Sequence, residues 1–249
     1  CPFLHIDKQI CKKGRRRMEH TKQRRKVWAI GCVTAGLALM ALSLCAWQVY
    51  AAAGREEAHI LAGRRVLLDP GHGGSDGGTT GLRTGSREAE VNLDVALHLR
   101  DELQAMGAEV VMTREDTGAV GEDKKADMRN RRAMIETAGQ DITVSIHQNS
   151  FPDPAVYGPQ VIYAPGSEAG QALADCVQRA LVAELRPERP RLITEGDYYI
   201  VKSGIAPAVI VECGFLSNEV EEALLLKEEY RARVAGAIAR GIAEYLQKA

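Results

Sequence analysis

Short runs of apolar, mostly β-branched residues alternate with segments of helical period, and this alternation constrains the fold more than any other feature. The runs span residues 66–68, 109–112, 142–146, 160–163 and 208–211. Between them, apolar residues recur every three or four positions. These helical periods extend from Glu88 to Leu103 and over residues 124–138, 168–185 and 230–247. The alternation predicts an α/β fold, a mostly parallel sheet with helices on both faces.

Several of these elements begin or end in side chains that can bind a metal ion. His72 follows the first run in a glycine-rich turn, His147 ends the third run, and Glu212 follows the fifth. Glu88 opens the first helical segment. Because ligands collect at the carboxyl ends of strands in open α/β sheets, we expect these four residues to share one rim. Two histidines and one carboxylate, with a coordination position left open, are typical of a catalytic zinc site.

Each of these residues also has a simpler interpretation. A lone histidine at a strand end more often makes a local hydrogen bond than binds a metal, and Glu88 alone is an ordinary acid at a helix start. The glycines of residues 71–78 suggest a phosphate loop, but the Lys-Ser/Thr pair of a P-loop is absent. Glu212 is harder to dismiss, because a carboxylate at a buried strand end needs partners. It could serve as a general acid and base in the hydrolysis of an amide.

The N-terminal part of the chain has a different character. Residues 1–26 contain ten Lys and Arg and two acids, and residues 27–53 contain no charged side chain. An uncharged stretch of this length, at about 1.5 Å per residue, can cross a hydrocarbon core about 30 Å thick. The basic residues on its amino side favour an extracytoplasmic location for the rest of the chain.

From this pattern we expect four parts: a basic cytoplasmic tail (1–26), a transmembrane signal-anchor helix (27–53), a linker (54–63) and a catalytic domain (64–249). Cleavage near Ala53, which would make the apolar stretch a signal peptide, is the alternative. Residues 1–17 could precede the true start of the protein, since Met18 opens a more ordinary signal-anchor.

Charge and cysteine content argue against other classes of protein. Residues 27–249 carry a net charge of about −9, which disfavours nucleic acid as a partner. Only Cys176 and Cys213 follow the apolar stretch, and both lie among apolar residues. We expect buried thiols rather than a disulfide framework. Cys213 adjoins Glu212, but no histidine–cysteine signature supports a nucleophile.

Five motifs lie at these positions: LDPGHGG (68–74), EAEVNL (88–93), VMTR (111–114), SIHQN (145–149) and VECGFLSN (211–218). Together, over about residues 65–246, they resemble the zinc-dependent N-acetylmuramoyl-L-alanine amidases of bacterial cell walls. The resemblance implies one Zn²⁺ per chain, with His72, Glu88 and His147 as ligands and Glu212 as the catalytic acid and base. It also implies hydrolysis of the amide between the lactyl group of N-acetylmuramic acid and L-alanine in peptidoglycan. Gln148 stands where many relatives have alanine.

Within that family, the chain is most similar to membrane-anchored, germination-specific amidases of endospore formers. The similarity lies in the N-terminus and in YGPQVIY (157–163) and DYYIVK (197–202). It implies action on the spore cortex, from the forespore intermembrane space, as a step toward the muramic-δ-lactam needed for germination. A vegetative amidase, a zinc peptidase that acts on stem peptides and a non-catalytic wall-binding domain are the alternatives. The short interval from Asn149 to Glu212 cannot hold a blocking helix, so we expect an open site controlled by expression, location or an activator protein.

Overall fold

The computed structural model describes residues 18, 28, 39–48 and 59–249, and the chain divides into two units, Cys1–Glu56 and Glu57–Ala249. In the first unit, residues 39–48 are helical and their side chains are exposed. Among the described residues, no helix has both the length and the apolar character needed to span a membrane. Most of the predicted tail (1–26), most of the predicted anchor (27–53) and half of the predicted linker (54–63) lie outside the described residues, and these parts stay predictions.

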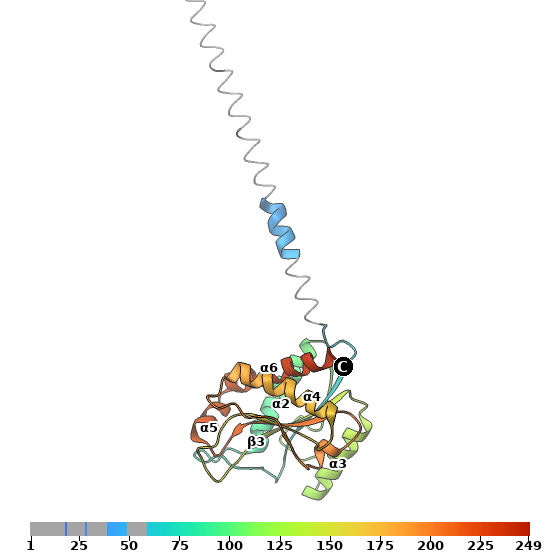
Figure 1. Ribbon diagram of the computed structural model, residues 1–249, viewed down its shortest axis with the longest axis vertical. Coiled ribbons are helices and arrows are strands. Elements are labelled where there is room, and N and C mark those ends of the chain that lie inside the picture. The colour runs from blue at the N-terminus through green and yellow to red at the C-terminus, as the bar shows by residue number, and fades with distance from the viewer. Residues whose placement is uncertain (1–17, 19–27, 29–38, 49–58) are drawn as a thin grey trace, which may run out of the picture. The chain divides into compact units, whose positions relative to one another are not determined.

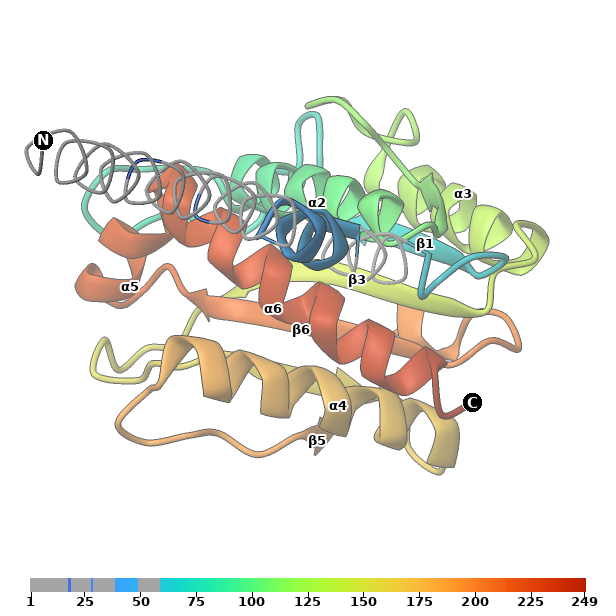
Figure 2. The same ribbon diagram turned by 90° about the horizontal axis from the view of Figure 1, so that it is seen from above.

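The second unit is built on a six-stranded sheet with the strand order β2-β1-β3-β6-β4-β5 (Figures 1 and 2). The strands are β1 (Arg65–Pro70), β2 (Glu109–Met112), β3 (Ile142–Asn149), β4 (Gln160–Tyr163), β5 (Thr194–Glu195) and β6 (Ala208–Phe215). All neighbouring strands pair in parallel except β4 and β6, which are antiparallel. The mostly parallel sheet is therefore confirmed, but β4 and the short edge strand β5 both run opposite to the other four strands, which was not predicted.

Helices cover both faces of this sheet, as predicted. The helices are α2 (Glu88–Ala105), α3 (Lys124–Thr137), α4 (Glu168–Leu185), α5 (Glu219–Leu225) and α6 (Glu228–Leu246), with a 3₁₀ helix η1 (Ile200–Lys202). The connections β1–α2–β2 and β2–α3–β3 run in opposite directions along the sheet. Right-handed crossovers therefore place α2 and α3 on opposite faces. Helices α4 and α6 share the face of α2 (Figure 2).

The two faces have separate cores, which follow from the alternation of side chains along a strand. Val66 and Leu68 of β1 join the larger core beneath α2, α4 and α6. Leu67 points the other way and packs with Ile135 of α3 and Ile200 of η1. Asp69 lies on the same face as Leu67 and is thereby carried beneath α3.

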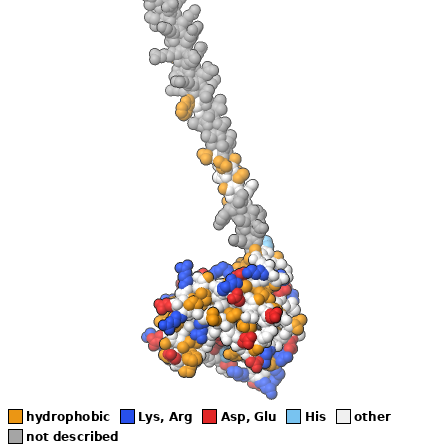
Figure 3. All heavy atoms as spheres, viewed as in Figure 1, with side chains coloured by type: hydrophobic (Ala, Val, Ile, Leu, Met, Phe, Trp, Pro, Cys, Tyr) orange, Lys and Arg blue, Asp and Glu red, His pale blue; other side chains and the backbone are white. Residues whose placement is uncertain are grey.

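Both ends of the second unit pack at the amino ends of the strands. The backbone N–H of Leu61, a fully buried residue, donates to the carbonyl of Met106 at 2.9 Å, just past the end of α2. Arg64 Nη2 donates to the carbonyl of Leu246, the last residue of α6, at 2.8 Å. On the face of this unit seen in Figure 3, acidic and basic side chains are interspersed.

A buried ion pair joins α3 to the carboxyl end of β1. Arg131 Nη1 lies 2.7 Å from Asp69 Oδ1, and the two side chains are only 2% and 1% exposed. The hydroxyls of Thr113 and Ser145 each donate to Asp69 at 2.7 Å. Burial would raise the pKa of Asp69, but the Arg131 charge and these hydrogen bonds outweigh it and lower the pKa. Arg131 also donates to the carbonyl of His72 at 2.5 Å, so the pair braces the turn that carries His72.

We expect Arg131→Met to destabilise the fold strongly, because it leaves the Asp69 carboxylate buried without its partner. Breaking a buried pair in this way costs about 3–5 kcal/mol, which corresponds to a fall in Tm of about 10 °C for a unit of this size. Thermal unfolding followed by circular dichroism measures it. Arg179→Met, which removes a half-exposed surface pair with Asp175, is the control and should change Tm little. A fall in Tm as small as that of the control would show that the pair does not brace the fold.

Candidate active site

The four predicted site residues lie at the carboxyl ends of β1, β3 and β6. His72 lies in the turn after β1, and Glu88 is the first residue of α2. His147 of β3 and Glu212 of β6 are register partners on adjacent strands and so point to the same face. The chain leaves β1 toward β2 on one side and returns to β3 on the other. The site therefore occupies the point of an open α/β sheet where ligands usually bind.

His72, Glu88 and His147 come together closely enough to hold a metal ion. One ligand atom from each lies within 4.8 Å of the others. His72 Nε2 is 3.3 Å and His147 Nδ1 is 2.9 Å from the same carboxylate oxygen, Oε1 of Glu88. Two ring nitrogens and one carboxylate oxygen form a donor set that suits zinc and leaves a position for a reactant. The residues present therefore fit a catalytic zinc ion.

The glycines of the turn allow these side chains to approach one another. A Cβ atom at Gly71 would lie 2.2 Å from Cε1 of His147. At Gly78, whose φ is +68°, a Cβ atom would lie 2.4 Å from Oε2 of Glu88. His72 itself has a φ of +61°, in the left-handed region that few residues other than glycine adopt. The turn is thus shaped around these side chains at Gly71 and Gly78, which accounts for those two glycines without a phosphate.

Asp76 is a site residue that the sequence analysis did not single out. Its Oδ2 lies 3.1 Å from Nδ1 of His72, four residues earlier in the same turn, and 3.2 Å from Nζ of Lys124. Burial opposes ionisation of Asp76, but hydrogen bonds from His72 and its other partners lower its pKa to about 2. A carboxylate that accepts from Nδ1 leaves Nε2 free for a metal. The acid four residues after His72 was the only signal in the sequence.

Glu88 is held on both of its oxygens. Oε2 accepts from the backbone N–H of Thr79 at 2.8 Å, and Oε1 accepts from the backbone N–H of Gln148 at 3.2 Å. Burial would raise the pKa of Glu88, but hydrogen bonds to His147 and His72 outweigh it and lower the pKa. The same contacts overcome burial at the two histidines and raise the pKa of each ring. The site therefore contains an ionised carboxylate placed to bind a cation.

Glu212 faces the same space from β6. Its Oε2 is buried and has no hydrogen-bond partner within the described residues. Burial raises the pKa of Glu212 to about 7, although the positive charge of His147 partly offsets this effect. A carboxyl group whose pKa is raised toward neutrality, beside a cluster that could hold a metal, is suited to accept a proton and return it.

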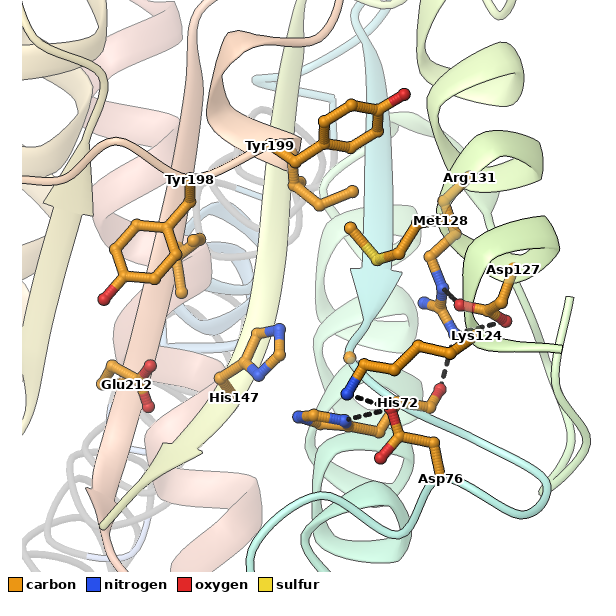
Figure 4. A pocket seen from close by; sticks show the side chains of 13 residues that line it. His72, Asp76, Lys124, Asp127, Met128, Arg131, His147, Tyr198, Tyr199 and Glu212 are labelled. Atoms are coloured by element: carbon orange, nitrogen blue, oxygen red, sulfur yellow. Dashed lines mark hydrogen bonds and ion pairs between the residues drawn. The ribbon is translucent and has the colours of Figure 1, made fainter. Parts of the chain in front are cut away.

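His72, His147 and Glu212 line a cavity of about 170 Å³ (Figure 4). Tyr198 and Tyr199, from the segment before η1, lie above His147 and Glu212, and Lys124 of α3 lies beside His72. Both tyrosines are exposed, at 51% and 40%. The sequence could not predict that these three residues line the cavity, because each comes from a segment that is distant in the chain from the histidines.

The cysteines are confirmed as buried free thiols. Cys176 and Cys213 are both buried, and neither forms a disulfide. Burial raises the pKa of the Cys213 thiol, which keeps it protonated at neutral pH. Because the thiolate is the reactive form, this burial disfavours a role for Cys213 as a nucleophile.

The fold is an open α/β sheet, and its site brings together three side chains that could hold a metal ion beside a buried carboxyl group. Residues 66–244 match the family described as N-acetylmuramoyl-L-alanine amidase, and the chain belongs to that family. It is 35% identical over 193 residues to the germination-specific N-acetylmuramoyl-L-alanine amidase of Bacillus subtilis (strain 168), covering 74% of this chain and 81% of the relative.

Two solved structures show the same similarity. The CwlD amidase from Clostridioides difficile, determined in complex with the GerS lipoprotein, has a TM-score of 0.72 and 32% identity, covering 75% of this chain and 100% of the other. The catalytic domain of CwlV, an amidase from Bacillus (Paenibacillus) polymyxa var. colistinus, has a TM-score of 0.67 and 33% identity, covering 74% of this chain and 98% of the other.

Proposed function

We propose that this amidase hydrolyses the bond between the lactyl group of N-acetylmuramic acid and L-alanine with one zinc ion per chain. His72, Glu88 and His147 would hold the ion, and Glu212 would transfer the proton. The observation that carries the proposal is the convergence of the three ligand atoms within 4.8 Å beside a carboxylate whose buried oxygen has no partner in the described part of the chain. Family membership supports the choice of substrate.

When bound, zinc supplies a Lewis acid that polarises the scissile carbonyl and makes water more acidic. Glu212 accepts the proton of the attacking water and delivers it to the amine of L-alanine as that group leaves. Asp76 keeps the proton of His72 on Nδ1 and so fixes the tautomer that can bind metal. Because the pKa of each ligand histidine is raised, protons compete with the metal and binding weakens as the pH falls.

Mass spectrometry of peptidoglycan digests tests the proposal. Peptidoglycan incubated with the protein and zinc should release intact stem peptides and leave glycan chains without stems, and a chelator should stop the release. Shortened stems would instead indicate a zinc peptidase. Unaltered peptidoglycan, with one zinc bound per chain, would indicate a wall-binding protein or a missing activator.

We propose further that the amidase acts on the spore cortex. The similarity to the Bacillus subtilis germination-specific amidase supports this role. Removal of stem peptides would expose muramic acid for deacetylation and formation of muramic-δ-lactam. Spores that lack the protein should then contain no muramic-δ-lactam in their cortex, whereas a vegetative role would leave the lactam content unaltered.

We also propose that residues 27–53 anchor the protein in the cell membrane by a single span, with residues 64–249 outside the cytoplasm. In sporulating cells this would be the forespore intermembrane space. The basic residues before an uncharged stretch support this orientation. Recovery of the protein in the soluble fraction, shortened near Ala53, would show secretion instead. The lipoprotein in complex with the Clostridioides difficile relative supports a lipoprotein partner for this chain, and we propose that such a partner could act as its activator.

A further inference from the structure

We propose that Gln148 is a positioning residue for the metal site: its side-chain amide fixes the orientation of Asn92, which in turn holds Glu88. The inference rests on the proposed role of Glu88 as a zinc ligand. It concerns two amide side chains that touch neither the reacting bond nor the metal position.

Asn92 lies at the centre of a buried chain of hydrogen bonds. Asn92 is fully buried and Gln148 is 3% exposed. Asn92 Nδ2 donates to the carbonyl of Gly71 at 3.1 Å and to Oε1 of Glu88 at 3.2 Å. Gln148 Nε2 donates to Oδ1 of Asn92 at 3.2 Å. The chain of contacts therefore runs from Gln148 through Asn92 to a ligand carboxylate.

The chemistry of these partners permits one orientation of each amide. The Gly71 carbonyl and the ionised Glu88 can only accept, so Asn92 must turn its NH₂ group toward them. Its Oδ1 then faces Gln148, which must present its own NH₂ group. Gln148 Oε1 is consequently left buried without a hydrogen-bond partner among the described residues. A buried acceptor without a hydrogen bond costs free energy. Gln148 is nevertheless buried in the orientation that leaves its Oε1 without a partner and lets its Nε2 donate to Asn92.

This chain of contacts links the segments that carry all three ligands. Gly71 precedes His72 and lies against the His147 ring, Glu88 opens α2, and Gln148 follows His147 in β3. Without a donor at residue 148, Oδ1 of Asn92 would be left buried without a partner. The Asn92 amide would then shift from the position in which its Nδ2 donates to both Gly71 and Glu88.

Gln148→Met tests the inference, because methionine is of similar length but has no donor. The backbone N–H of residue 148 still donates to Glu88, so the substitution removes only the side-chain contact. Loss of an outer partner of a metal ligand weakens metal binding about 10–100-fold, and we expect a zinc Kd raised about 10-fold. Competition with a chromogenic chelator, on the full chain, measures this Kd without any assay of turnover.

The double variant separates positioning from packing. Asn92→Leu should also raise the zinc Kd, and adding Gln148→Met to it should raise the Kd no further, because Gln148 acts through Asn92. Gln178→Met is the matched control, since Gln178 is also buried but bonds to the backbone of Val161 and Pro159. It should leave the zinc Kd unchanged even if it lowers the Tm.

Two results would overturn the inference: a Gln148→Met Kd within twofold of the parent, or losses that multiply in the double variant. If Gln148→Met does not fold, Gln148→Ala replaces it in the same cycle and is judged by the same criteria. A parent chain that binds no zinc would contradict the proposed function itself. The failure of the inference is thereby distinguished from the failure of the function.

Discussion

Glu212→Gln is expected to lower kcat for amide hydrolysis by about 10²–10⁴-fold, the range usually contributed by a general acid or base. Glutamine keeps the shape of the side chain but cannot take up a proton. The zinc content should stay at one per chain, because Glu212 is not among the three residues whose ligand atoms cluster. Release of stem peptides measures kcat, and elemental analysis measures the metal. Nearly full turnover would assign the proton transfer to another group, and loss of zinc would make Glu212 a ligand.

The same substitution should stabilise the metal-free protein at alkaline pH. The pKa of Glu212 is raised from 4.5 to about 7 in the folded state, so the folded protein binds this proton more tightly than the unfolded chain. Its contribution to stability is therefore lost as the pH rises from about 4.5 through about 7. Above that range, the metal-free Glu212→Gln variant should have a higher Tm than the parent. Equal Tm values at pH 8 would show that ionisation of Glu212 does not destabilise the folded protein.

His72→Ala is expected to abolish stoichiometric zinc binding and, with it, activity. It removes one of the three ligand atoms, and the remaining histidine and carboxylate cannot complete the donor set of a catalytic site. Dialysis against a weak chelator followed by elemental analysis should find less than about a tenth of the zinc of the parent, since even the loss of an outer partner costs about 10–100-fold in affinity.

Two comparators make this result specific. Asp76→Asn leaves the ring of His72 in place but removes the carboxylate 3.1 Å from its Nδ1, and should weaken zinc binding less than His72→Ala. His98→Ala changes a histidine in the middle of α2, away from the cluster, and should leave the zinc content as it is. Unchanged zinc in His72→Ala would remove His72 from the ligand set.

The sequence predicts the regular elements well because their patterns are local. The apolar runs and helical periods place β1 to β4, β6 and the helices α2, α3, α4 and α6, and the residues at strand ends mark the rim. The sequence also contains a local indication that β4 is reversed. It is missed when each strand is assigned separately, because it lies in the link between two strands. Residues 150–159 link β3 to β4 with ten residues and three prolines, and a parallel connection needs a longer crossover. β4 must therefore oppose β3 and also β6, which is parallel to β3.

The rest of the site depends on tertiary contacts that no sequence period marks. Asp76 reaches His72 only because the turn folds back on itself, and Gln148 reaches Asn92 only because α2 packs across β3. Tyr198 lies in the cavity because the short edge strand β5 and η1 carry it across the sheet. Two residues of strand are too few for any alternation to be recognised.

The placement of the two ends of the catalytic unit has a consequence for how it can meet its substrate. Leu61 and Leu246 are both fastened at the edge of the sheet opposite the cavity. The points of attachment at both ends of the unit therefore lie at the edge of the sheet opposite the cavity. Peptidoglycan is an insoluble meshwork, so the edge of the sheet that carries the cavity has to face the polymer. Immobilising the protein through either end should accordingly preserve its access to intact sacculi.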